Sequence, residues 1–224
     1  MVKVLGVPAT YARKLRNEAL LLCVGNFGLM GLSVAIVYVY YLFDVKFSVV
    51  SLTPPFVLFL YASYMLSSAR VSYTKANVGV RAEVRVSKTL VRCAPYALVH
   101  GSTLGFRGDI DHIVVGPCLA TVETKYGVGK VGLNAENDLV CGGKIIKGNP
   151  IAQASRAADA VSKHAGVDCD AVVVVTDGTT PPFRHKGVTV CSLKDLVSVL
   201  SSFPNTRVSA DRAARLAESL YVSG

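Results

Sequence analysis

The chain has 224 residues, of which 51% are hydrophobic, and 24 Lys and Arg outweigh 15 Asp and Glu to give a net charge of +9. A mean hydropathy of +0.44 excludes an ordinary soluble protein, and the length allows one domain with an appendage. Six scattered cysteines, without a Cys-x-x-Cys pair, argue against a zinc motif and favour reduced thiols.

Two long uncharged segments follow a basic N-terminal stretch, residues 1–18. Residues 19–43 carry no charge and would span about 37 Å as a helix, which exceeds the roughly 30 Å of bilayer hydrocarbon. After a short connection at 44–46, residues 47–69 are also uncharged. The sequence therefore predicts a transmembrane hairpin of two helices over residues 19–69.

The residues around these segments predict their ends and orientation. Pro54 and Pro55 suit the first turn of a helix, so the second helix is expected to begin near them. A cleaved signal peptide is the alternative for the first segment, but the apolar run is too long and no convincing cleavage site precedes Asp44. Both outer flanks are basic, which predicts a multi-pass protein of the inner (cytoplasmic) membrane with both termini in the cytoplasm. Gly31 and Ala35 could form a small-residue helix contact.

The rest of the chain reads as a basic linker at 70–76, a mixed α/β domain at 77–203 and a C-terminal helix within 204–224. The expected fold class is α/β, with a mixed sheet flanked by helices. The expected elements are a helix over 76–92, a strand over 97–102, a hairpin of 108–115 and 120–125, a short hairpin within 138–148, a helix from 149 to about 164, strands at 170–175 and 187–191, a helix from 192 to about 203, and a last helix over 209–221.

The hairpin carries polar residues where alternation alone would predict core. If paired residue numbers sum to 234 or 235, Asp111 faces Glu123 or Thr124, while Glu123 and Lys125 share one face. Two carboxylates and a lysine at this spacing suit metal-assisted phosphodiester cleavage, with Mg²⁺ held by oxygen ligands. The alternative is a surface hairpin on which Asp111 and Lys125 form an ordinary solvated ion pair.

Four segments resemble the nuclease-related domain family, which is similar to the broader restriction-endonuclease-like group. They are residues 105–117 (GFRGDIDHIVVGP), 122–125 (VETK), 148–154 (GNPIAQA) and 79–83 (GVRAE), the last followed by Val86 and Leu90. The resemblance covers about residues 77–200. It implies a restriction-endonuclease-like core behind the membrane anchor.

The resemblance also implies a site. Asp111 and Glu123 would be metal ligands for Mg²⁺ or Mn²⁺, Lys125 the catalytic lysine, and Glu83 and Gln153 would complete the catalytic group. The chain departs from the family just after the lysine, where an aromatic residue follows at once and is succeeded by glycine.

Other polar residues near the hairpin have competing interpretations. Asp109, in phase with Asp111, is either a second ligand or an acid that flanks a turn. His112 should point to the opposite face and be structural. His100, His164 and His185 form no visible constellation.

From residue 70 onward, 19 Lys and Arg against 13 Asp and Glu give a net charge of +6, which favours nucleic acid or anionic membrane lipid as a partner. Lys130, Lys144 and Lys147 are the candidate nucleic-acid contacts. The leading hypothesis is a membrane-anchored, metal-dependent nuclease that hydrolyses DNA at the cytoplasmic face. The alternative is a non-catalytic membrane recognition protein on a nuclease-like fold, with a membrane protein as its partner, for example in exclusion or defence in bacterial mobile elements.

Overall fold

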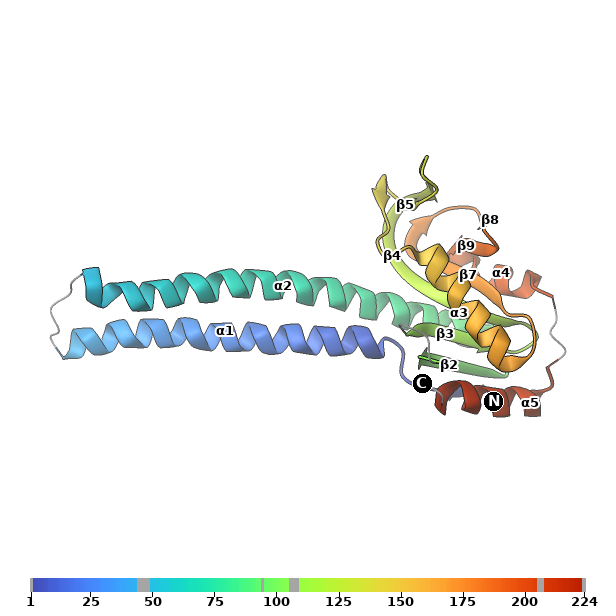
Figure 1. Cartoon of the computed structure of the whole chain (residues 1–224), viewed down its shortest axis with the longest axis horizontal. Coiled ribbons are helices and arrows are strands. Elements are labelled where there is room, and N and C mark those ends of the chain that lie inside the picture. Colours follow the sequence, from blue (N-terminus) through green and yellow to red (C-terminus); the bar gives the residue numbers. More distant parts are fainter. Residues whose placement is uncertain (1, 44–48, 94, 105–108, 205–207, 223–224) are drawn as a thin grey trace. The chain divides into compact units, whose positions relative to one another are not determined.

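The computed structural model describes residues 2–43, 49–93, 95–104, 109–204 and 208–222. The chain divides into two compact units, one made of Met1–Tyr11 with Val78–Gly224 and the other of Ala12–Asn77. The helical unit is thus an insertion within a domain whose first residues precede it in the chain (Figure 1). The predicted connection at 44–46 and the motif residues 105–108 lie outside the described residues.

Two helices provide the inserted unit: α1, Thr10–Leu42, from Ala12 onward, and the part of α2, Val49–Arg92, up to Asn77. Both are long and apolar enough to cross a membrane by length and composition. Buried residues recur every seven positions, as Ala19, Asn26 and Ser33 on α1 and as Pro55, Ala62 and Ala69 on α2.

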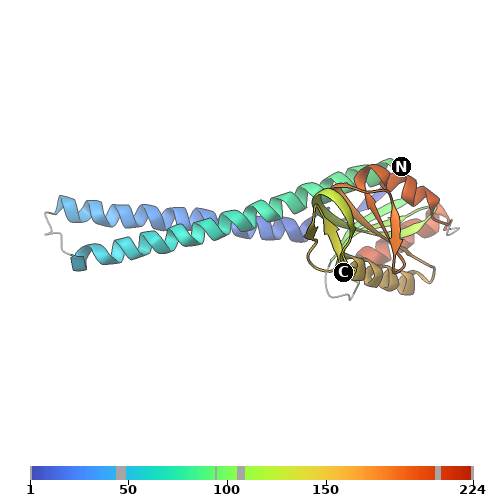
Figure 2. The ribbon, with the colours of Figure 1, turned by 90° about the horizontal axis from the view of Figure 1, so that it is seen from above.

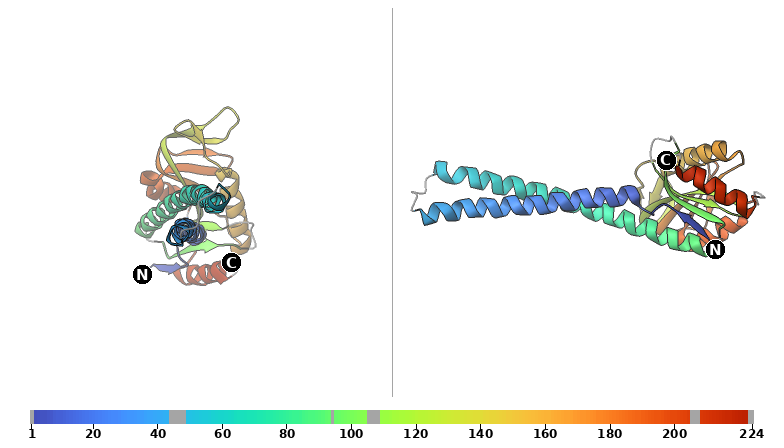
Figure 3. Two further views of the ribbon diagram at one scale, coloured as in Figure 1. Left: turned by 90° about the vertical axis from the view of Figure 1, so that its left-hand side faces the viewer. Right: turned by 90° about the horizontal axis from the view of Figure 1, so that it is seen from below.

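This seven-residue spacing keeps one stripe of each helix toward its neighbour, and small side chains let the backbones approach closely. When the buried residues of α1 are matched with those of α2 in reverse order, the two residue numbers of each pair sum to 88. This is the pattern of an antiparallel hairpin (Figure 3). Gly31 and Ala35, the predicted contact, are exposed instead, because they lie off this stripe.

Helix α2 begins at Val49, so Pro54 and Pro55 lie inside it rather than at its start. Each proline removes one backbone N–H donor, and here the loss is confined to the first two turns of the helix. Residues 70–76, predicted as a linker, are helical, and α2 continues to Arg92.

The other unit is a mixed α/β domain. Among the described residues its strands form a nine-stranded sheet in the order β1-β2-β3-β4-β7-β9-β8, with β5 and β6 attached to β4 as a side arm. The strands are β1 Lys3–Leu5, β2 Ala97–Ser102, β3 Ile110–Val115, β4 Leu119–Leu133, β5 Leu139–Cys141, β6 Lys144–Ile145, β7 Asp170–Thr179, β8 Phe183–His185 and β9 Val188–Ser192. Strand β1 runs parallel to β2. Strand β3 is antiparallel to both of its neighbours, β2 and β4, and β7 runs parallel to both β4 and β9.

Helices cover both faces of this sheet. One face is covered by α4, Leu196–Ser202, and by the C-terminal end of α2, through Val86, Leu90 and Leu196. Helix α4 follows the short 3-10 turn Leu193–Asp195. The other face is covered by α3, Pro150–Ala165, and α5, Ala210–Val222, through Val161 and Leu220. Figure 2 shows the end of α2 and α3 on opposite sides of the strands, and Figure 3 shows α5 (red) beside β1 (blue).

The mixed α/β class is confirmed, and so are the hairpin with its three-residue turn at 116–118, the short β5–β6 hairpin and the later helices. The Val-rich run at 171–175 is at most 6% exposed, as expected for a strand covered on both faces. Strands β1 and β8 were not predicted, because each has only three residues and no alternation to reveal it. All six cysteines are free thiols.

Candidate active site

The β3–β4 hairpin brings acidic side chains from two neighbouring strands together. His112 pairs with Val122, so residue numbers sum to 234, which is one of the two predicted registers. Continued by one residue, this register sets Asp111 opposite Glu123. The Oδ2 atom of Asp111 accepts a hydrogen bond from the Thr124 backbone N–H at 2.7 Å. This bond ties the Asp111 carboxylate to β4 beside Glu123.

These residues line a pocket of about 590 Å³ in the α/β unit. All five side chains predicted for the catalytic group or the metal line it, together with Asp109 and an unexpected contribution from the start of the chain. The lining residues are Thr10, Tyr11, Gly79, Glu83, Gly101, Asp109, Asp111, Glu123, Thr124, Lys125, Tyr126 and Gln153. Its size lies within the range of small-molecule sites.

Lys125 is held between two acceptors. Its Nζ lies 2.7 Å from Oε1 of Glu123 and donates to Oε1 of Gln153 at 3.4 Å. Because the lysine side chain is only 23% exposed and that of Glu123 only 4%, solvent screens this pair weakly. These two contacts therefore give the ammonium group a defined position in the pocket lining.

Gln153 reaches the lysine because of how α3 begins. Asn149 adopts a left-handed backbone conformation with φ 44° and caps the helix, its side chain accepting from the Ala152 N–H at 3.2 Å. Pro150 occupies the first turn, where its missing N–H removes no helical bond. The Asn-Pro pair thus starts α3 so that its first turn ends at the pocket.

Glu83, in the part of α2 that belongs to the α/β unit, carries a perturbed carboxyl. Burial is the main cause that raises its pKa from 4.5 to about 7, and the charges of Glu123 and Asp109 act in the same direction. A hydrogen bond from the Ala9 backbone and the charge of Lys125 oppose the shift. Glu83 therefore titrates near neutral pH.

The acids of the pocket repel one another. Burial raises the pKa of Asp111 well above its usual value, and the charges of Glu123 and Glu83 add to that rise. Burial also raises the pKa of Glu123, although Lys125 counteracts it. One lysine thus faces several carboxyl groups, and a bound cation would relieve their repulsion.

The donor set fits a hard divalent cation. Among the residues that the structure describes, no three His, Cys, Asp or Glu side chains are grouped to hold a metal by themselves. Mg²⁺ does not require such a group, because it is usually bound by one or two carboxylates, with waters and substrate phosphate completing the shell. Asp111 and Glu123 could supply those carboxylate oxygens.

Strand β4 changes course directly after Lys125. The β4–β7 register shifts between Lys125 and Val128, which marks a bulge. A Cβ at Gly127 would lie 2.8 Å from the Cys141 sulfur and 3.0 Å from Val175 Cγ1, so only glycine fits without displacement. The preceding Tyr126 remains 48% exposed on the pocket lining.

His112 is fully buried on the other side of β3, as predicted for a structural residue. Its Nδ1 lies 2.7 Å from Nδ1 of His100, whose Nε2 is 3.2 Å from Ser87 Oγ. Burial lowers the pKa of both imidazoles, to about 4 for His100, so both rings are neutral at physiological pH. This pair was missed because the partners lie on separate strands.

The three lysines predicted to contact nucleic acid do not line the pocket. Lys130 is on the distal half of β4, Lys144 on β6 and Lys147 just after it, and all are exposed. They belong to the side arm formed by β4, β5 and β6, which Figure 1 shows extending from the sheet.

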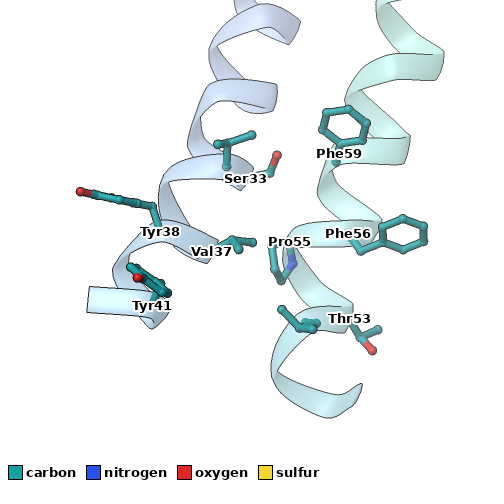
Figure 4. Close-up of a pocket in the computed structure, with 10 residues that line it drawn as sticks. Ser33, Val37, Tyr38, Tyr41, Thr53, Pro55, Phe56 and Phe59 are labelled. Carbon is teal, nitrogen blue, oxygen red and sulfur yellow. The ribbon is translucent and has the colours of Figure 1, made fainter. Parts of the chain in front are cut away.

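A larger cavity, about 810 Å³, lies elsewhere, between α1 and α2 near the end of their hairpin. Figure 4 shows that Tyr38, Tyr41, Phe56 and Phe59 are among its lining residues. Among the residues that the structure describes, its lining contains no carboxylate, lysine, histidine or cysteine, and the two helices are apolar enough to meet lipid.

Residues 78–176 match the family model of the nuclease-related domain. The match begins in the final part of α2 and ends in β7, so it contains all five predicted catalytic and metal-binding residues. Thr10 and Tyr11, which also line the pocket, lie outside it. No curated protein and no solved structure matches the chain.

Proposed function

Because residues 78–176 form a nuclease-related domain, we propose that this chain is a nuclease that uses Mg²⁺ or Mn²⁺ to hydrolyse phosphodiester bonds of DNA. The observation that carries the proposal is the meeting of Asp111, Glu123 and Lys125 in one pocket. Both carboxylates come from rigid neighbouring strands, as a preorganised site requires.

Each side chain has a role that its position supports. Asp111 and Glu123 would hold the cation, which would supply neutralisation of phosphate charge and a lower pKa for a bound water. Lys125 places its ammonium group beside the attacking water and stabilises the negative charge that develops on phosphate. Gln153 accepts a hydrogen bond from Lys125 and so keeps the ammonium group oriented. Glu83 titrates near neutral pH and can exchange a proton with water in the pocket.

We also propose that the side arm guides the substrate. Lys130, Lys144 and Lys147 are exposed on this arm, and the chain from residue 70 onward has a net charge of +6. Lysines of this kind neutralise phosphates without reading the bases, so their contribution should fall steeply with salt.

A membrane anchor is the remaining part of the proposal. The two long apolar helices support it, and so does the pairing of β1 with β2, which places residues from both sides of the helical insertion in one folded unit. If the hairpin crosses a membrane, this pairing requires both of its ends to lie on the same side. The basic flanks favour the cytoplasmic side of the inner membrane. Attaching a reporter that folds only in the cytoplasm to the C-terminus tests this orientation, and an inactive reporter would contradict it.

The nuclease proposal is tested with the full-length protein in detergent. A fragment that begins at residue 70 would lack β1 and Ala9, which belong to the α/β unit. Supercoiled plasmid and single-stranded DNA are incubated with Mg²⁺, Mn²⁺ or EDTA, using wild type, Asp111→Asn, Glu123→Gln and Lys125→Met. Glu136→Gln, an exposed acid outside the pocket, is the matched control.

We expect cleavage that requires the cation and is unchanged in Glu136→Gln. In each of the three site variants the cleavage rate should drop by about two orders of magnitude or more. Cleavage that all three variants retain would reject the proposed site. A wild-type protein that never cleaves, with biological activity that survives combined Asp111→Ala and Lys125→Ala changes, would instead support the non-catalytic alternative.

A further inference from the structure

The N-terminal segment is fixed along the α/β unit before it reaches the pocket. Lys3, Val4 and Leu5 of β1 pair in parallel with β2. Gly6 then passes so close to β2 that a Cβ there would lie 2.3 Å from the His100 carbonyl oxygen. With φ 78° as well, this position admits only glycine.

The next residues are fixed as well. Ala9 is 3% exposed, has the left-handed φ of 64° and donates its backbone N–H to the Glu83 carboxyl group. Thr10 Oγ1 donates to the Val7 carbonyl at 2.7 Å. A backbone held at these points presents Tyr11 to the pocket with little freedom to lose on binding.

Tyr11 and Tyr126 are the two aromatic residues of the pocket lining, and both are exposed. They are 61% and 48% exposed, whereas Glu123 and Thr124 in the same lining are 4% and 8% exposed. The two tyrosines come from elements far apart in sequence, the start of α1 and the bulge of β4. Neither tyrosine belongs to a hydrophobic core cluster, so about half of each residue's surface remains open to a ligand.

We propose that Tyr11 and Tyr126 stack on unpaired bases next to the scissile phosphate, so that the site selects single-stranded or frayed nucleic acid. The inference rests on the proposed function, because it uses the same pocket. An aromatic ring recognises any base through its π-face, and stacking of this kind is largely independent of sequence. In an intact duplex the base faces are covered by their neighbours, so rings beside the cleavage chemistry reach only bases that have left the stack.

A different role for Tyr11 is contact with lipid, since tyrosine is favoured at membrane interfaces and Tyr11 lies in the first turn of an apolar helix. The two roles predict different effects of the Tyr11 ring and of the ligand's bases on oligonucleotide affinity. Stacking requires an aromatic ring in Tyr11 and a base in the ligand, whereas lipid contact is indifferent to the oligonucleotide.

The test measures binding by the full-length protein in detergent, with Ca²⁺ in place of Mg²⁺ to slow turnover. The probes are a short fluorescent oligothymidylate, the corresponding oligouridylate, an abasic strand with the same number of phosphates, and a closed duplex. The variants are Tyr11→Ala, Tyr11→Phe and Tyr126→Ala. Tyr96→Ala is the control, since Tyr96 is 41% exposed in the same unit but lies outside the pocket.

Tyr11→Ala and Tyr126→Ala should each raise the Kd for the single strands about tenfold, as the loss of one stacked base predicts. Tyr11→Phe and Tyr96→Ala should bind like wild type, and the abasic strand should bind all proteins equally weakly. Weaker binding of the oligouridylate alone would restrict the ligand to DNA. Equal affinity of wild type and Tyr11→Ala, equal affinity for abasic and normal strands, or no measurable binding would overturn the inference.

The outcomes separate the two proposals. Base-dependent binding through Tyr11 without any cleavage would retain the stacking site and reject the nuclease. Metal-dependent cleavage with an unchanged KM for single strands in Tyr11→Ala would retain the nuclease and reject the stacking site.

Discussion

Replacing Glu83 with glutamine should stabilise the metal-free protein at alkaline pH. The amide keeps an oxygen that can accept the Ala9 N–H but removes the titrating carboxyl. In wild type the pKa of Glu83 is raised from 4.5 to about 7 in the folded state, mainly by burial. Between pH 4.5 and about pH 7 the folded protein binds more protons than the unfolded chain, so the free energy of unfolding of wild type falls as pH rises. Below pH 4.5 the carboxyl is protonated in both states and contributes nothing.

The size of the effect follows from that shift. Each pKa unit is worth about 1.4 kcal/mol, so moving from 4.5 to about 7 costs wild type up to about 3 kcal/mol near pH 8. For a domain of this size that corresponds to roughly 6–12 °C in Tm. Glu83→Gln should recover this stability near pH 8 and lose its advantage near pH 4.5. Because the Glu83 charge also raises the pKa of Asp111, its removal should ease ionisation of Asp111 as well.

The assay is thermal unfolding of the full-length protein in detergent with EDTA, followed by far-ultraviolet circular dichroism because the chain has no tryptophan. Hydrogen exchange of β3 and β4 reports on the α/β unit separately from the helices. Glu136→Gln is the exposed control and should follow wild type at every pH. Mg²⁺ should reduce the difference in Tm between Glu83→Gln and wild type, because it stabilises wild type. A Glu83→Gln protein that melts with wild type near pH 8, or that shows the same difference near pH 4.5, would refute the electrostatic reasoning.

Three further outcomes follow from backbone positions. Gly127→Ala should destabilise the α/β unit by about 1–3 kcal/mol, since its Cβ would collide with Cys141, and a denaturant titration that finds no loss would contradict the packing of the bulge. Asn149→Ala should cost about 1–2 kcal/mol, whereas Asn149→Gly should cost only a few tenths because glycine accepts the left-handed cap; equal losses would deny the capping role. Deleting residues 2–9 should abolish cleavage and speed hydrogen exchange in β2, because β1 and the Ala9 N–H are lost; retained protection in β2 would argue against the β1–β2 pairing.

Local patterns account for most of what the sequence could predict. The turn at 116–118 and strand alternation determine the register that sets Asp111 opposite Glu123, and the Asn149-Pro150 pair marks the start of α3. Such signals need only a few neighbouring residues. For that reason the hairpin, the helices of the α/β domain and the grouping of acids with Lys125 could be predicted from the sequence.

The missing part of the site depends on contacts between distant segments. Lys3 and Ala97 are separated by the whole helical unit, yet they are partners in the sheet. Nothing near Ala9, Thr10 or Tyr11 in sequence distinguishes them from a basic flank of a membrane helix. The His100–His112 pair escaped notice for the same reason, since strand pairing brings the rings together and spacing along the chain does not.

The inserted helical unit makes this long-range pairing easier to form. Closing a flexible loop becomes less favourable as the loop lengthens, and 66 unstructured residues would separate Tyr11 from Val78. An antiparallel helical hairpin returns the chain to its starting end, so its two ends are already close before β1 meets β2. The heptad stripe from Ala19 to Ser33, matched by the one from Pro55 to Ala69, provides that hairpin with its own packing. The small seam residues of α1 and α2 thus support the pocket indirectly, because they hold together the two ends from which the sheet and the Glu83–Ala9 contact are built.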